Sequence, residues 1–250
     1  MGRKSGGDVY MKVLITGASG GIGFATACEL AHRGHQVIAG VLNESERGVY
    51  EAVPGVETML LDITKAEDRT AAAAHEPDVL INNAAVGMIG PLALFPMDRV
   101  RALFEVNVFA TLQMTQAMIP AMVARGSGRI VIVSSVAGIR ASAMAGPYAM
   151  SKHALQAMGS SLRMELAPQG VDVVLANPGA YGTGFNDRMV ASVREWLKPE
   201  DAGPYEPFIE RMAGIITVDQ MDPAEAGPHM ADLCEAKETE LVNPIPPGLF

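Results

Sequence analysis

Short apolar runs recur along this chain, and helix-length segments separate them. The runs are rich in Val, Ile and Leu and are bounded by turn residues, which is typical of strands buried on both faces of a sheet. Strand and helix alternate nearly throughout, so we expect one doubly wound parallel sheet of about seven strands, with helices on both faces. The runs are KVLITG from Lys12, QVIAGV from Gln36, VETMLLD from Val56, DVLINN from Asp78, RIVIVSS from Arg129 and VDVVLANPG from Val171.

The segments between the runs predict helices and one insertion. Residues 22–33, 97–124 and 148–167 have helical length, and the last carries a stripe of Leu155, Met158, Leu162 and Leu166. Residues 183–217 break the alternation with scattered prolines, and a stretch that long is typical of a substrate-covering loop region. We expect residues 11–250 to form a single domain, and residues 1–10 to be an N-terminal extension or a cloning remnant ahead of Met11.

The composition narrows the possible partners. Apolar residues make up 49% of the 250 residues, which indicates a large core. The net charge is −9, which disfavours nucleic acid and anionic membranes as partners. The two cysteines, Cys28 and Cys234, are far apart, so we expect a reducing cytoplasm, no disulfide and no metal site. No apolar run approaches the roughly 20 residues that span a bilayer.

A glycine-rich turn, TGASGGIG at residues 16–23, follows the first apolar run and precedes a helix. Glycines there allow backbone N–H groups to approach a pyrophosphate at the helix N-terminus, so the turn predicts nucleotide binding. The same residues also spell GxSxG, the nucleophile elbow of serine hydrolases, with Ser19 as nucleophile. That alternative needs a downstream histidine, and His75, His153 and His229 all lack a setting at a strand end.

Tyr148 and Lys152 lie four residues apart in a segment of helical pattern, so their side chains meet on one face. Both groups have ordinary pKa values near 10. An ammonium beside a phenol favours the phenolate, and we therefore expect Lys152 to lower the pKa of Tyr148 and make it an acid/base group.

Five motifs occur together in one order: TGxxxGxG, NNAA at residues 82–85, Ser134-Ser135, YxxxK and NPG. In order and spacing they resemble the short-chain dehydrogenase/reductase family over residues 12 to about 183. The resemblance implies a Rossmann-type domain and an NAD(P)-dependent oxidoreductase that interconverts a ketone and a secondary alcohol. The C-terminal segment and SLRMEL resemble the retinol- and hydroxysteroid-dehydrogenase-like branch.

The resemblance also implies roles for individual residues. Tyr148 would be the acid/base, Ser135 the hydroxyl that holds the substrate oxygen, and Lys152 the residue that tunes the tyrosine and holds the nicotinamide ribose. Asn107 would anchor a water that links the lysine to solvent. Asp62 would accept from the adenine amino group, although capping a helix near Thr64 is the alternative. The cofactor-binding set is Thr16, Gly17, Ser19, Gly21, Ile22, Gly23, Asp62, Ile63, Asn82, Ala84, Tyr148, Lys152, Pro178, Gly179 and Thr183.

Neither hallmark of cofactor choice occurs at the end of the second run. An acid there selects NAD and an arginine suits the phosphate of NADP, but the site falls at Val41 and Leu42. Because no acid repels a phosphate and Arg47 is nearby, we favour NADP(H) over NAD(H).

The candidate substrate residues are mostly apolar: Met88, Met144, Tyr181 and Met189, beside Ile89 and Ala143. They predict an uncharged, fairly hydrophobic ketone or secondary alcohol, and Arg140 is a candidate contact for an anionic group. By resemblance, the helices at 97–124 and 148–167 predict a homodimer or homotetramer. A third hypothesis is a catalytically silent, dinucleotide-sensing regulator, although the chain keeps both Tyr148 and Lys152.

Overall fold

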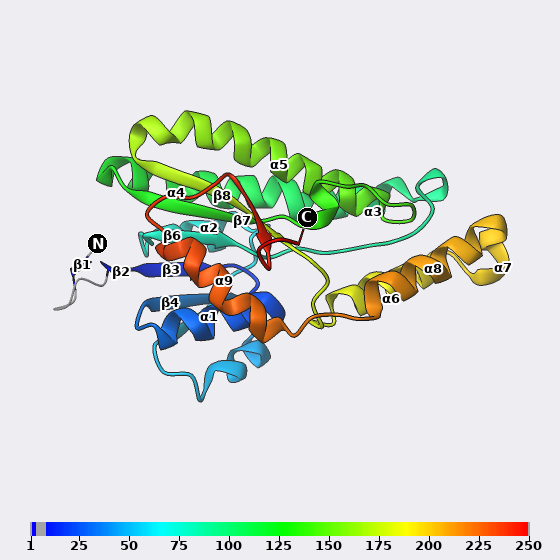
Figure 1. The fold of residues 1–250 in the computed structure, drawn as a ribbon, viewed down its shortest axis with the longest axis horizontal. Helices are drawn as coiled ribbons and strands as arrows, with labels where there is room; N and C mark the ends of the chain where they lie inside the picture. The colour runs from blue at the N-terminus through cyan, green and yellow to red at the C-terminus, as the bar shows by residue number, and fades with distance from the viewer. Residues whose placement is uncertain (1, 4–8, 250) are drawn as a thin grey trace.

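Seven parallel strands form the central sheet of the computed structural model, which describes residues 2–3 and 9–249. The strand order is β5-β4-β3-β6-β7-β8-β9 (Figure 1). The strands are β3 (Lys12–Ile15), β4 (Gln36–Val41), β5 (Val56–Leu60), β6 (Val79–Asn82), β7 (Gly128–Val133), β8 (Val171–Pro178) and β9 (Val242–Ile245).

The predicted doubly wound sheet is confirmed, and all six apolar runs are strands in it. Val13 on β3 pairs with Val37 on one side and with Val79 on the other. The seventh strand, β9, pairs with β8 at the edge, with Ile245 opposite Pro178. Because every strand runs in the same direction, the carboxyl ends of all seven lie at one edge of the molecule, where α/β proteins bind ligands.

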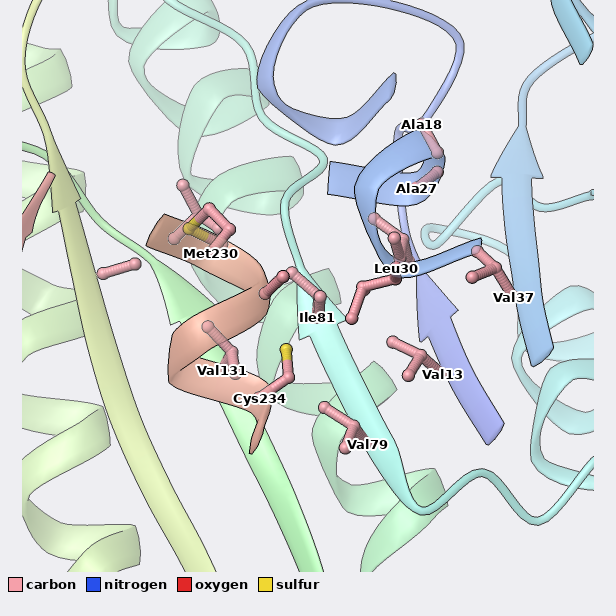
Figure 2. Close-up of a cluster of buried hydrophobic side chains, with 14 of the residues drawn as sticks. Val13, Ala18, Ala27, Leu30, Val37, Val79, Ile81, Val131, Met230 and Cys234 are labelled. Carbon is pink, nitrogen blue, oxygen red and sulfur yellow. The ribbon is translucent and has the colours of Figure 1, made fainter. Parts of the chain in front are cut away.

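Alternate residues along the strands point to opposite faces of the sheet and contribute to two hydrophobic cores, one on each face. Val13 and Ile15 face α1 (Gly21–His32) and α9 (Pro223–Glu235), whereas Leu14 faces α2 (Ala66–Ala73), α4 (Thr111–Arg125) and α5 (Gly146–Leu166). Figure 2 shows the first core, in which strand residues of β3, β6 and β7 meet Leu30 of α1 and Met230 of α9.

The predicted helices form with one interruption. Residues 22–33 and 148–167 correspond to α1 and α5. Residues 97–124 form α3 (Met97–Phe104), a π-helical segment η3 (Glu105–Ala110) and then α4. Single π-helical turns are often found at functional sites. Shorter helical turns are η1 (Glu44–Tyr50), η2 (Leu92–Leu94), η4 (Val136–Gly138) and η5 (Ala167–Gln169).

The segment expected as a loop region, residues 183–217, is mainly helical. It contains α6 (Phe185–Arg194), α7 (Pro199–Ala202), η6 (Gly203–Tyr205) and α8 (Glu206–Thr217), which extend beyond the sheet in Figure 1. The Asn186 amide donates to the Ile216 carbonyl at 2.8 Å, and Arg194 pairs with Glu206. These contacts hold α6 against α8, while the covering role of the segment stays a prediction.

The structure describes part of the predicted N-terminal extension. β1 (Gly2–Arg3) and β2 (Val9–Tyr10) form a two-stranded antiparallel sheet. Met1 and residues 4–8 lie outside the described residues, so the prediction of an extension at 1–10 stays a prediction. Within residues 2–3 and 9–249, no helix has the length and apolar character to cross a membrane, and no acidic, His or Cys cluster has metal-binding geometry.

Arg129 on β7 ties the sheet to the end of α9. Its Nε lies 3.0 Å from the Asp172 carboxylate on β8. Its two terminal nitrogens donate to the carbonyls of Leu233, Cys234 and Ala236 at 2.6–2.9 Å. One half-buried guanidinium therefore satisfies the last carbonyls of α9, which have no partner within the helix.

We expect Arg129→Ala to lower the free energy of unfolding by about 3 kcal/mol, because several charge-assisted hydrogen bonds are lost together. The control is Arg99→Ala, which removes a pair with the 61% exposed Glu195 and should cost less than about 1 kcal/mol. Urea denaturation measures both. Equal losses for the two variants would contradict the assigned role of Arg129.

Candidate active site

The carboxyl ends of the strands open into a cavity of about 1580 Å³. A small-ligand pocket measures roughly 300–1,000 Å³, so this one has room for a dinucleotide and a second molecule. The predicted residues that line it are Gly17, Ser19, Gly21, Ile22, Asp62, Ile63, Ala84, Ser135, Tyr148, Lys152, Pro178, Gly179, Tyr181, Thr183 and Met189. The predicted residues that do not line it are Thr16, Gly23, Asn82, Met88, Asn107 and Met144.

The glycine-rich turn is shaped for close approach of a ligand to the backbone. Gly17 and Gly21 have φ angles of +61° and +55°, which side chains other than glycine rarely adopt. A Cβ on Gly21 would lie 2.8 Å from the Thr183 side chain, so these two walls of the cavity meet only because residue 21 has no side chain. The turn precedes the N-terminus of α1, where N–H groups without helical partners suit a pyrophosphate.

Thr16 and Asn83 hold this turn against the loop after β6. The buried Thr16 hydroxyl accepts from the backbone N–H groups of Asn83 and Ala84, both at 3.0 Å. The Asn83 amide donates to the carbonyls of Thr16 and Gly17 at 3.0 and 2.8 Å. Thr16 therefore shapes the site from beneath, without lining it.

The side chain of Asn82 does not face the cavity, whereas Asn83 lines it. The Asn82 amide donates to Thr115 on α4 at 2.9 Å, which turns it into the core. Side chains alternate in direction along a strand, so the next residue faces the cavity, and Asn83 lines it. The NNAA motif contains both asparagines, and the register of β6 decides which of them faces the cavity.

At the far end of the cavity, Asp62 follows β5. Its carboxylate accepts from the N–H and the hydroxyl of Thr64 at 3.0 and 2.6 Å. These hydrogen bonds hold the pKa of Asp62 below its ordinary value. The geometry is an Asx turn rather than a helix cap, because α2 begins only at Ala66.

Glu46 is an acid that lies near the end of β4, although the sequence pattern indicates no acid at that site. Glu46 lines the cavity, and its carboxylate accepts from the Leu42 N–H and the Asn43 amide, both at 2.9 Å. Arg47, the expected cation, pairs with Glu44 at 2.9 Å and does not line the cavity. The helical turn η1 brings Glu46 back to the strand end, which spacing alone does not indicate.

Tyr148 and Lys152 lie on one face of α5, one turn apart, as predicted. The Lys152 Nζ lies 5.7 Å from the centre of the Tyr148 ring and donates to the Val133 carbonyl at 2.8 Å. Lys152 is 2% exposed. Burial lowers the pKa of the Lys152 ammonium to about 7.

The expected lowering of the tyrosine pKa by the lysine is not found. Burial raises the pKa of Tyr148 to about 12, and hydrogen bonding by the Ser135 side chain opposes the rise. Desolvation disfavours the charged form of each group, so it moves the two pKa values in opposite directions. At neutral pH, Tyr148 is therefore a protonated phenol that can donate.

The structure separates the two serines after β7. Ser134 is buried, and its hydroxyl donates to the Lys152 carbonyl at 3.2 Å and accepts from Gln156 at 3.1 Å. Ser135 accepts from the Ala137 N–H at 3.1 Å, and its side chain acts to lower the pKa of Tyr148 through hydrogen bonding. Ser135 is thus the hydroxyl that shares the tyrosine's environment, in agreement with the role that the resemblance implies.

Asn107 lies in the π-helical segment and fixes the start of α5. Its amide accepts from the Val86 N–H and donates to the Val86 carbonyl, both at 2.8 Å. It also donates to Ser151 at 3.1 Å, and Ser151 donates to the Tyr148 carbonyl at 2.8 Å. Asn107 is a positioning residue in this arrangement, and its water-anchoring role stays a prediction.

The four candidate substrate residues differ in their place relative to the cavity. Met88 and Met144 do not line the cavity, whereas their neighbours Ile89 and Ala143 do. Tyr181 lines the cavity but is 3% exposed and packs into the hydrophobic core under the sheet. Its ring is therefore fixed by packing instead of being free to face a substrate.

The hydrolase alternative finds no support in this geometry. Ser19 lines the cavity, but no histidine of residues 9–249 is among the lining residues. His153 places its Nδ1 2.9 Å from the Ala149 carbonyl within its own helix. A serine nucleophile needs a base within hydrogen-bond reach.

Residues 11–194 match the family model described as short chain dehydrogenase. That match covers most of the chain and the whole YxxxK site. This chain belongs to the short-chain dehydrogenase family. It is an oxidoreductase that acts on CH–OH groups with a nicotinamide dinucleotide.

Similar proteins include an uncharacterized oxidoreductase, YbbO, of Escherichia coli (strain K12), which is 37% identical over 73% of this chain and 71% of that protein. Human 17-beta-hydroxysteroid dehydrogenase type 1 is 35% identical over 80% of this chain and 66% of its own.

Two solved structures are similar in fold. NAD⁺-bound xylitol dehydrogenase has a TM-score of 0.79 and 26% identity, covering 94% of this chain and 96% of that one. A short chain dehydrogenase from Burkholderia cenocepacia J2315 in complex with NADP has a TM-score of 0.72 and 28% identity, covering 93% and 87%.

Proposed function

We propose that Tyr148 is the proton donor and acceptor of a reaction that interconverts a fairly hydrophobic ketone and a secondary alcohol. The observation that carries the proposal is that Tyr148 and Ser135, both half-buried, and the buried Lys152 lie together on the cavity wall. When bound, a nicotinamide dinucleotide supplies or accepts the hydride. The glycine turn, Asp62, Asn83 and Thr183 would hold it.

The residues of the chain have separate tasks in this proposal. The Tyr148 phenol donates its proton to the carbonyl oxygen during reduction. The Ser135 hydroxyl donates a hydrogen bond to the same oxygen, which stabilises the negative charge that develops there. Protonated Lys152 stabilises the phenolate that remains on Tyr148.

The apolar part of the cavity supports a hydrophobic substrate. Its walls beyond Tyr148 come from the loop after β6 and from α6 and α8, so they enclose the space next to the phenol. The residues are Ile89, Phe185, Met189, Met212 and Ile215.

Tyr148→Phe keeps the ring but removes the proton. We expect the turnover number for ketone reduction to fall about 10²–10⁴-fold, while cofactor affinity stays within about twofold because the phenol oxygen, not the ring, is lost. Absorbance of the reduced cofactor measures turnover across a ketone panel, and fluorescence titration measures affinity. Tyr205→Phe, a half-buried tyrosine that does not line the cavity, is the control. Unchanged turnover in Tyr148→Phe would contradict the role.

For the cofactor, we propose that NAD(H) is preferred, which revises the NADP(H) preference drawn from the sequence. Of the described residues that line the cavity at the end of β4, Glu46 is the charged one, and Arg47 is turned to Glu44. A carboxylate near the adenosine ribose repels a 2′-phosphate and can accept from a 2′-hydroxyl.

Separate titrations with NADH and NADPH test this preference. The wild type should bind NADH more tightly, and Glu46→Gln should strengthen NADPH binding roughly 10-fold by removing the like charge. The control is Glu44→Gln, an exposed neighbour that does not line the cavity. Tighter binding of NADPH by the wild type, with no change in Glu46→Gln, would restore the NADP(H) assignment.

We also propose that the chain forms a homodimer or homotetramer. Phe109, Met150 and Met164 are 52%, 45% and 70% exposed on η3 and α5. Exposed large apolar side chains on neighbouring helices favour an interface.

A cytoplasmic location stays a prediction, supported by the free state of Cys28 and Cys234.

A further inference from the structure

Three arginines line the cavity from three different elements. Arg140 follows η4, Arg188 lies on α6 and Arg211 lies on α8. The acidic residues in the lining, Glu46 and Asp62, follow β4 and β5 at the opposite end of the strand order. The part of the cavity beside α6 and α8 is therefore positively charged, although the whole chain has a net charge of −9.

These arginines differ from most others in the molecule because they lack partners. Within the described residues, the side chains of Arg140, Arg188 and Arg211 form no hydrogen bond or ion pair, and the only other described arginine side chain in that state is Arg101. The arginines with partners are Arg33, Arg47, Arg69, Arg99, Arg125, Arg129, Arg163 and Arg194.

Apolar residues accompany Arg211 and Arg188 on the helices that carry them. On α8, Phe208, Arg211 and Ile215 all line the cavity, at the spacing of one helical face. On α6, Phe185 and Arg188 do the same. A ligand that fits both features has an apolar body and an anionic group, because a guanidinium binds carboxylates and phosphates through paired N–H donors.

An anion in the cavity could belong to the substrate or to the pyrophosphate of the cofactor. Arg188 lies at the cofactor side, because its Nη1 would be 3.2 Å from a Cβ on Gly184, one residue after Thr183. Thr183 in turn meets Gly21 of the pyrophosphate-binding turn. Arg140, after η4, and Arg211, on α8, belong neither to the glycine-rich turn nor to the segment around Thr183, so we assign them to the substrate.

We propose that the substrate is an amphipathic oxo or hydroxy compound with an anionic group, and that Arg140 and Arg211 bind that group. This deepens the proposed function, on which it rests, by replacing an uncharged substrate with a charged one. Reduction proceeds as before: hydride adds to the carbonyl carbon, the proton of Tyr148 goes to the oxygen, and the anionic group takes no part.

The test uses ligands that cannot react, so that binding is measured apart from turnover. Calorimetric titration compares decanoate with its neutral analogue decanol, each in the presence of the reduced cofactor, with which neither an alcohol nor a carboxylate can react. We expect the wild type to bind decanoate at least 10-fold more tightly than decanol. Arg140→Gln/Arg211→Gln should remove that difference, since each loses charge-assisted hydrogen bonds. Arg188→Gln should instead weaken cofactor binding, and Arg101→Gln, which lies outside the cavity, should change neither.

A second arm reads catalysis with 9-oxodecanoate and its methyl ester. The double variant should raise KM for the acid at least 10-fold and leave the turnover number and the ester unchanged. Equal binding of decanoate and decanol by the wild type would overturn the proposal, whatever the turnover. Preferential binding of decanoate that depends on the two arginines, without turnover of either ketone, would support the anion site and count against the proposed reaction alone.

Discussion

The buried ammonium of Lys152 is the constraint on which the rest of the site depends. Removing a cation from water is costly, and within the described residues the Lys152 ammonium donates to one carbonyl, that of Val133 at 2.8 Å. The same burial lowers the pKa of Lys152 to about 7 and raises that of Tyr148 to about 12. Both groups are thereby moved away from the behaviour they have in water, and the cost is offset by the packing of the sheet and its helices.

The sheet and α5 meet closely enough to enforce this burial. β7 supplies the Val133 carbonyl, the two serines follow it, and α5 supplies Tyr148 and Lys152. Between them, a Cβ on Gly138 would lie 2.5 Å from the Ser134 hydroxyl and 2.9 Å from the Lys152 carbonyl. A side chain there would push η4 away from α5, so glycine at this position keeps the serine and the tyrosine within reach of each other.

Sequence patterns predicted what depends on local periodicity. The apolar runs indicated the strands, and the i, i+4 spacing placed Tyr148 and Lys152 on one helix face. They did not predict what depends on register or on distant packing. Asn82 and Asn83 are the same residue type at neighbouring positions, so the sequence does not distinguish them. In the structure, the Asn82 side chain points into the core and the Asn83 side chain bonds the glycine-rich turn. Glu46 reaches the cavity only because η1 folds back on β4, and the direction of the Tyr148 pKa shift depends on burial that no spacing reports.

The most direct test of this account is the titration of Lys152 itself. Nitrogen-15 NMR of labelled lysine side chains, assigned with Lys152→Met, follows its ammonium signal as the pH rises. The account predicts a midpoint near 7, with the charge lost as pH increases through that value, because the folded protein disfavours the charged form. A midpoint close to the ordinary 10.5 would show that the ammonium is solvated, and would contradict the buried arrangement on which the proposed chemistry rests.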